Sequence, residues 1–324
     1  MIRLPMLTFL VSLISVAGLA QTQEMVQLKT ADLNLNGTLT LPDGATGRVP
    51  VLLLIAGSGA TDRDGNNPIP AGQMGSVKAN SYKLLADSLS KAGVAVLRYD
   101  KRGVGTSKLL NMNEASLTFD TYIEDAVGWI KQLRNDKRFS NVGIVGHSEG
   151  SLIGMVAARQ AKADVFVSLA GPGDDICEKL KTQVGKQLPD ESKQEVFRAL
   201  DSLKGGHTLR KLPTPYAPVR QLFRPSVQPY LISWMKYNPA AQLKLLTIPV
   251  LIIQGMRDVQ VSVKDAELLK AARPSARIKL FEAMSHGLKD VRTDSMQEAI
   301  TSYNEPGGPL TAGLAAEIAH FIKG

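Results

Sequence analysis

The sequence predicts an α/β protein built on a doubly wound, mostly parallel β-sheet with an inserted helical cap. Short, almost wholly apolar runs alternate along the chain with amphipathic stretches of helical spacing. Such runs are typical of parallel strands buried on both faces, and the stretches between them supply right-handed crossovers. In open sheets of this kind, ligands bind beyond the carboxyl ends of the strands. Functional residues are therefore expected in the loops that follow each strand.

The predicted elements follow one another in a regular order. Residues 26–30 and 33–41 alternate apolar and polar side chains, which predicts two antiparallel edge strands. Further strands are predicted at residues 51–55, 94–99, 142–145, 165–170, 250–254 and 277–281, and helices at residues 82–91, 121–133 and 151–159.

An insertion separates two of the predicted strands. About eighty residues lie between the strand that ends at Ala170 and the one that starts at Pro249, whereas a βα loop is typically about two to six residues long. Helical patterns at residues 176–187, 192–203 and 229–237 lie in this segment. We therefore expect a helical cap at approximately residues 174–246, placed over the functional site.

The first twenty residues have the pattern of a secretory signal peptide. They contain one charge, Arg3, followed by an apolar run and then by small residues that end at Ala20. The apolar run is shorter than the roughly 20 residues that a membrane-spanning helix needs. We expect cleavage after Ala20, a mature domain at residues 21–324 in the periplasm or outside the cell, and no stable membrane span.

Composition limits the classes of function. The chain of 324 residues is 44% hydrophobic and 21% charged, which is ordinary for a globular protein with a large core. Its net charge of +8 comes from basic residues spread among acidic ones, so nucleic-acid binding is not expected. Cys177 is the only cysteine, and the four histidines show no metal-ligand spacing. No disulfide, metal or cofactor is expected.

The strongest functional motif is Gly-His-Ser-Glu-Gly at residues 146–150. An apolar strand precedes it and a helical pattern follows it. In such a strand–turn–helix the central serine takes a strained backbone conformation, and glycines flank it because a Cβ would collide with neighbouring backbone. The helix N-terminus favours developing negative charge. Ser148 is therefore the predicted nucleophile.

A serine nucleophile requires a base, oriented by a carboxylate. His286 follows the strand at residues 277–281 and is the predicted base. His147 lies inside the serine motif, where we expect its side chain to point away from Ser148. His207 and His320 lie in a predicted cap loop and in the last helix.

Asp258 is the predicted acid, because it follows the strand at residues 250–254. The resulting chain order is serine, aspartate, histidine. Asp258 could instead cap the next helix, but that helix is predicted to begin later, near Ser262.

The oxyanion of an acyl-transfer intermediate needs two backbone N–H donors. One is expected from Glu149, which follows the nucleophile, and the other from Ser58, in the Ala-Gly-Ser-Gly loop after the strand at residues 51–55. In the neighbouring loop, the charges of residues 62–66 are expected to pair with Lys101 and Arg102 rather than to take part in catalysis.

Three aromatic residues in the predicted cap share one helix face. Tyr230, Trp234 and Tyr237 recur at i, i+4 and i+7 after Pro229. This spacing is typical of a helix face buried in the core. If the face lines the cleft instead, it forms an acyl or aryl pocket for the substrate.

These motifs resemble the bacterial α/β-hydrolase superfamily, and particularly its serine aminopeptidase-like and short-chain carboxylesterase group. The resemblance rests on the serine motif, on the loop at residues 56–65 and on residues 97–105, and it extends from about Val26 to the C-terminus. Ser151 stands where a further glycine is commoner, and Ala60 stands where proline is commoner. The resemblance implies an acyl-enzyme mechanism without a cofactor, mostly on esters and in some members on peptides.

The sequence thus predicts a secreted or periplasmic serine hydrolase that cleaves carboxylic esters with short acyl chains. An aminopeptidase or other exopeptidase on the same triad is the alternative, and a binding protein that kept only the fold is a third. An aminopeptidase needs carboxylates in its cap to hold the free amine. Residues 202–246 contain seven Lys or Arg and no Asp or Glu, which favours esters, including those of anionic acids.

Overall fold

The computed structural model describes residues 22–324 except 71–74, 109–112, 186–187 and 214–216. The predicted signal peptide lies outside the described residues. Within the described ranges, no helix has both the length and the apolar character needed to cross a membrane.

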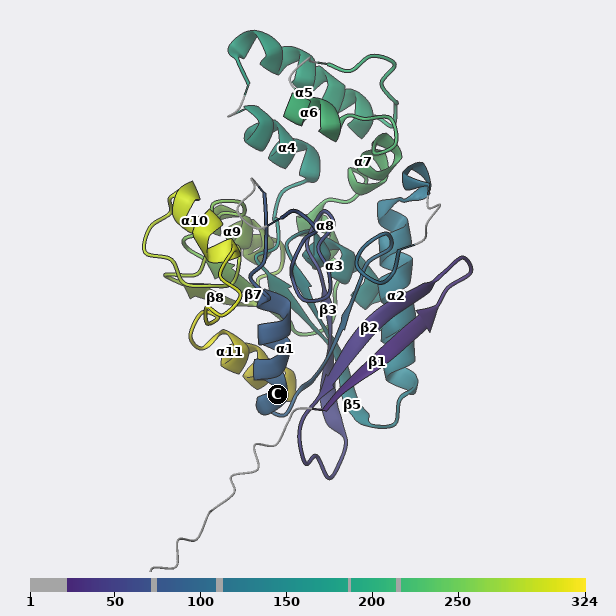
Figure 1. Ribbon diagram of the computed structural model, residues 1–324, viewed down its shortest axis with the longest axis vertical. Helices are drawn as coiled ribbons and strands as arrows, with labels where there is room; N and C mark the ends of the chain where they lie inside the picture. Colours follow the sequence, from purple (N-terminus) through teal and green to yellow (C-terminus); the bar gives the residue numbers. More distant parts are fainter. Residues whose placement is uncertain (1–21, 71–74, 109–112, 186–187, 214–216) are drawn as a thin grey trace, which may run out of the picture.

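An eight-stranded sheet forms the centre of the molecule, as predicted (Figure 1). Its spatial order is β1-β2-β4-β3-β5-β6-β7-β8, with β2 antiparallel to β1 and β4 and the remaining neighbours parallel. The strands are β1 (Thr22–Lys29), β2 (Asn34–Leu41), β3 (Val49–Ile55), β4 (Ala95–Tyr99), β5 (Phe139–His147), β6 (Val165–Leu169), β7 (Val250–Gly255) and β8 (Arg277–Phe281).

Helices cover both faces of this sheet because the central strands are apolar on both sides. In β3, Leu53 belongs to one apolar cluster, whereas Leu52 and Leu54 belong to another. The first cluster includes α2 (Phe119–Asn135), α3 (Glu149–Ala161) and α9 (Val263–Ala272). The second includes α1 (Ser81–Lys91) and α11 (Leu314–Lys323). This arrangement confirms the doubly wound fold.

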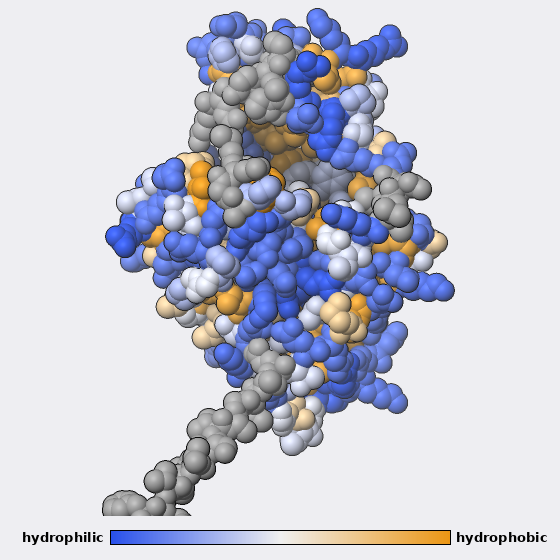
Figure 2. All heavy atoms as spheres, viewed as in Figure 1, coloured by the Kyte–Doolittle hydropathy of each residue, from blue (hydrophilic) through white to orange (hydrophobic). Residues whose placement is uncertain are grey.

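The segment between β6 and β7 is helical. It holds α4 (Ile176–Gly185), α5 (Asp190–Lys204), α6 (Ala217–Leu222), α7 (Gln228–Trp234) and α8 (Pro239–Lys244). Helices α4 to α7 stand together above the sheet, and Figure 2 shows apolar surface in a hollow between them and the sheet domain.

Helices α6 and α8 of the cap were not among the predicted elements, and neither were two helical elements outside the cap. A short 3-10 helix, η1 (Glu114–Ser116), precedes α2, and α10 (Met296–Tyr303) follows β8. Helix α10 bears on the functional site.

Candidate active site

Ser148 lies at the sharp turn between β5 and α3, with φ 53° and ψ −123°. Its neighbours explain the two flanking glycines. A Cβ on Gly150 would come within 2.3 Å of the Ile55 carbonyl oxygen, and one on Gly146 within 2.3 Å of the Gly150 carbonyl oxygen. The Ser148 N–H donates to the Leu169 carbonyl at 3.0 Å, which ties the turn to β6. Close backbone packing therefore holds Ser148 in its strained conformation.

His286 and Asp258 form a hydrogen-bonded pair after β8 and β7. His286 Nδ1 lies 2.7 Å from Asp258 Oδ2. The backbone N–H groups of Gln260 and Val261 donate to Asp258 Oδ1, each at 2.8 Å. Burial alone would raise the pKa of Asp258, but the charge and hydrogen bond of His286 and these two amides hold it below its ordinary value. An ionised Asp258 accepts a hydrogen bond from His286 Nδ1–H, which leaves His286 Nε2 unprotonated and able to act as a base.

Ser148 and His286 line the same cavity, which has a volume of about 550 Å³. Ser148 Oγ has no hydrogen-bond partner among the residues that the structure describes, and catalytic hydrogen bonds often tighten only when substrate binds. The described part of the lining contains no Asp, Glu, Lys or Arg. Its other members are Gly57, Ser58, Thr61, Gly65, Asn67, Gly75, Ser76, Val77, Ser81, Tyr82, His147, Gln260, Gly287, Leu288, Met296, Ile300 and Tyr303.

The backbone around the predicted oxyanion donors is fixed. Gly57 packs against Ser148, since a Cβ on Gly57 would meet Ser148 Cβ at 3.2 Å. Its own N–H is engaged, because it donates to Tyr82 Oη at 3.0 Å. Within the described part of the chain, the backbone N–H groups of Ser58 and Glu149 have no hydrogen-bond acceptor, so both are available to a ligand. Ser58 also lines the cavity.

The three aromatic residues of the cap are placed away from this cavity, and α7 ends at Trp234, so Tyr237 lies beyond the helix. Trp234 is buried and stacks on Phe119 of α2, with ring centroids 5.6 Å apart and an interplanar angle of 4°. The Tyr237 hydroxyl donates to Asp120, and Tyr230 packs against Phe119. Within the described lining none of the three contributes to the Ser148 cavity, so their shared face serves mainly to pack the cap onto α2.

Helix α10 supplies the apolar wall instead. Met296, Ile300 and Tyr303 line the cavity, and they recur at i, i+4 and i+7, the same spacing as in the cap helix. This spacing was the available sequence signal for a pocket wall after β8.

His147 takes part in a hydrogen-bond chain that sequence reasoning missed. Tyr82 Oη lies 2.8 Å from His147 Nδ1, and His147 Nε2 lies 3.0 Å from the carbonyl oxygen of His286. A carbonyl oxygen only accepts, so Nε2 carries the proton and Nδ1 accepts from the Tyr82 hydroxyl. Burial, together with the nearby His286, lowers the pKa of His147 to about 3. The ring is therefore neutral and connects the Gly57 loop to the backbone of His286.

The predicted partners of the loop at residues 62–66 were wrong. Arg63 pairs with Asp100 at 2.7 Å, and Asp64 pairs with Arg98. Arg102 instead pairs with Asp125 and Asp32. The loop is therefore held by Arg98 and Asp100, whereas Lys101 donates to the Gly57 carbonyl oxygen.

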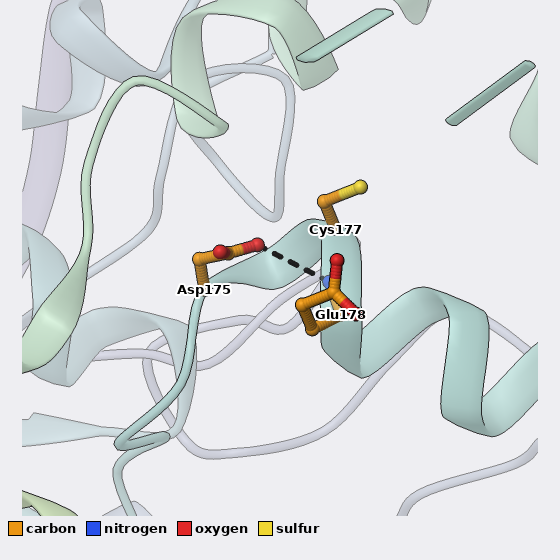
Figure 3. Close-up of side chains that lie close together, drawn as sticks. All are labelled: Asp175, Cys177 and Glu178. Carbon is orange, nitrogen blue, oxygen red and sulfur yellow. Dashed lines mark hydrogen bonds between the residues drawn. The ribbon is translucent and has the colours of Figure 1, made fainter. Parts of the chain in front are cut away.

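Asp175, Cys177 and Glu178 form a cluster in the cap whose ligand-type atoms lie within 4.8 Å of one another (Figure 3). Lys204 pairs with Asp175 at 2.9 Å, and Lys181 pairs with Glu178 at 3.1 Å. Burial raises the pKa of the Cys177 thiol to about 11, so it is protonated at neutral pH. These ion pairs and the neutral thiol account for the cluster as part of the α4–α5 packing.

Comparisons with known proteins identify a matching family and a relative of this chain. Residues 76–185 match the model of the serine aminopeptidase family, S33. Over 259 residues the chain is 32% identical to Esterase EstD of Thermotoga maritima, which covers 78% of this chain and 57% of that protein. The chain thus spans little more than half the length of this curated relative.

Solved structures of low sequence identity share the fold. Esterase Pf2001 of Pyrococcus furiosus matches with a TM-score of 0.56 at 17% identity, covering 94% of this chain and 91% of that one. Proline iminopeptidase of Mycobacterium smegmatis matches with a TM-score of 0.54 at 17% identity, covering 93% and 98%. One architecture therefore carries proteins named as esterases and as peptidases.

Proposed function

Because the chain is a member of the α/β-hydrolase superfamily with serine aminopeptidase-like and esterase relatives, we propose that it is a serine esterase that cleaves neutral carboxylic esters. Ser148 is the nucleophile, His286 the base and Asp258 the acid that orients it. This assignment is supported by the cavity that Ser148 and His286 both line and by the hydrogen bond between His286 and Asp258.

The reaction proceeds through an acyl-enzyme. His286 Nε2 takes the proton of Ser148 Oγ as the oxygen attacks the ester carbonyl carbon, and Asp258 stabilises the imidazolium that forms. The N–H groups of Ser58 and Glu149 donate to the oxyanion. His286 then gives its proton to the departing alcohol. Water, deprotonated by the same base, attacks the acyl carbon and releases the acid and Ser148.

The uncharged lining of the cavity is the observation that favours a neutral substrate. An aminopeptidase must hold the free ammonium of its substrate, which requires a carboxylate or a comparable set of acceptors near the nucleophile. An ester of an anionic acid would need a cation in the same place. The described lining offers neither. Neutral acyl groups on the apolar wall of α10 fit this cavity best, and the earlier expectation of anionic acids loses its support.

Peptide hydrolysis is the second candidate, because the matching family model is that of the serine aminopeptidases. Glu149 and Glu114 line a separate cavity on the cap side, but Glu114 is already paired with Arg224 and Glu149 with Lys101. A free amine would have to displace one of these cations.

A fluorophosphonate probe tests the proposal. We expect the wild type and the exposed-serine control Ser116→Ala to be labelled and Ser148→Ala to remain unlabelled. A series of p-nitrophenyl esters and aminoacyl p-nitroanilides then separates the two candidates, with turnover expected on the esters. A folded wild-type protein that neither reacts with the probe nor hydrolyses any ester would exclude the esterase.

Export is part of the same proposal. The apolar run and small residues before Gln21 support a cleaved signal peptide and a periplasmic or secreted enzyme. Mass spectrometry of the protein purified from cells should give a chain that begins at Gln21. A chain in the cytoplasm with an intact N-terminus would contradict export.

A further inference from the structure

Lys101 is a buried cation that the proposed mechanism leaves unused. It follows β4 and is 2% exposed. Its Nζ donates to the carbonyl oxygen of Gly57 at 2.5 Å and lies 3.7 Å from Glu149 Oε1. The ring of Tyr122 lies 5.4 Å from the same nitrogen. Burying an ammonium is costly unless it is paired and hydrogen-bonded, and both polar partners of Lys101 belong to the oxyanion region.

Through these two contacts Lys101 acts on the two segments that supply the proposed oxyanion donors. The Gly57 carbonyl belongs to the same peptide group as the Ser58 N–H, so a cation on that carbonyl orients the group and makes its N–H a stronger donor. The Glu149 side chain belongs to the residue that supplies the second N–H. Glu149 Oε1 accepts no hydrogen bond from any described residue, and Lys101 is the cation that pairs with it.

Gly57 is therefore held on both sides. Lys101 binds its carbonyl oxygen, and Tyr82 binds its N–H. The Gly57–Ser58 peptide has little freedom to rotate, and its N–H is fixed before any substrate arrives. Donors that need no reorganisation during the reaction are the ones that stabilise a transition state most.

We propose that Lys101 is a positioning residue that preorganises the oxyanion hole, acting through the Gly57–Ser58 peptide and through Glu149. The inference rests on the proposed esterase function. Lys101 touches neither the substrate nor the reacting atoms, so its removal lowers the rate of the chemical step rather than the affinity for the ester.

The first test compares Lys101→Met, Lys101→Arg and the exposed-lysine control Lys131→Met on a p-nitrophenyl ester. Lys101→Met is expected to lower kcat by about 10- to 100-fold with KM within about twofold, since loss of one oxyanion donor costs on the order of 100- to 1,000-fold. Lys101→Arg should recover part of the loss because it keeps a cation and donors, and Lys131→Met should match the wild type.

The second test uses pH and does not require Lys101 to be replaced. Burial lowers the pKa of Lys101, and the negative charge of Glu149 partly opposes this. Glu149→Gln keeps the backbone N–H but removes the charge, so Lys101 loses its proton at a lower pH. The alkaline fall in kcat should therefore move to lower pH in Glu149→Gln, an effect that a purely structural lysine would not produce.

The outcomes are distinct. A folded Lys101→Met with wild-type kcat would overturn the inference and leave the esterase intact. If Lys101→Met does not fold, the inference is overturned when the alkaline fall in kcat occurs at the same pH in Glu149→Gln as in the wild type. Absence of ester hydrolysis by the wild type overturns the proposed function, and the role of Lys101 with it.

Discussion

His147 donates a hydrogen bond from Nε2 to the main-chain carbonyl oxygen of His286 at 3.0 Å. The residue that precedes the proposed nucleophile thus holds the backbone of the proposed base. Its other nitrogen accepts from Tyr82, whose oxygen accepts from Gly57. Three hydrogen bonds in series therefore connect the Gly57 loop to the backbone of His286.

The neutral state of His147 makes the stability of the protein depend on pH. Its folded-state pKa is lowered from 6.5 to about 3, so the unfolded chain binds the additional proton between these values. Stability therefore falls as pH decreases through this window, by up to about 1.4 kcal/mol per pH unit from this residue. Denaturant unfolding between pH 6.5 and pH 4 should show a shallower decline for His147→Gln than for the wild type. An equal decline in unfolding free energy for the two proteins would contradict a neutral, buried His147.

Removal of the Tyr82 hydroxyl should affect both stability and rate. Tyr82→Phe leaves the Gly57 N–H and His147 Nδ1 without their partner, which should cost roughly 1–3 kcal/mol of unfolding free energy. A loosened oxyanion loop should also lower kcat by about tenfold, which corresponds to about 1.4 kcal/mol of transition-state stabilisation. Tyr237→Phe removes a hydroxyl that binds Asp120 away from the cavity, and its kcat should stay at the wild-type value. Similar kcat values for the two variants would refute the coupling.

The wall formed by α10 should set the length of the acyl group. Ile300→Trp fills part of the cavity, so kcat/KM for p-nitrophenyl octanoate should fall at least about tenfold relative to the acetate. The same substitution at Ile278, which is 37% exposed on the edge strand β8, should leave the ratio unchanged. A preserved ratio in Ile300→Trp would place the acyl group elsewhere.

The packing around the nucleophile should not tolerate a methyl group. Gly150→Ala places a Cβ 2.3 Å from a backbone oxygen of β3, where no side chain can move aside. We expect a loss of more than about 3 kcal/mol, or no folded protein. Gly47→Ala, where a Cβ meets nothing within 4 Å, is the matched control in thermal unfolding. Comparable melting temperatures would show that the turn can relax.

The sheet and the geometry of Ser148, Asp258 and His286 followed from the sequence because their signals are local or topological. The apolar run, the flanking glycines and the following helix all adjoin Ser148 along the chain. Asp258 and His286 each follow a predicted strand, and the carboxyl ends of parallel strands meet at one edge. The residues that support them are different. Tyr82, His147 and Lys101 act through contacts between distant segments, and sequence spacing does not encode those contacts.

The pocket wall shows a second limit of sequence patterns. Two segments have large apolar or aromatic residues at the same helical spacing, one in the cap and one after β8. The aromatic residues of the cap pack on Phe119, whereas Met296 and Ile300 of α10 line the cavity. Periodicity identifies a buried face, but which surface buries it depends on how the elements are assembled.

The uncharged lining of the cavity also bears on how turnover ends. Hydrolysis converts a neutral ester into an acid that ionises at neutral pH. A carboxylate in this cavity would lose its hydration without gaining a counterion from the described lining. If the proposed esterase function holds, the acid should therefore bind less well than the ester that replaces it, and accumulated acid should inhibit the enzyme little.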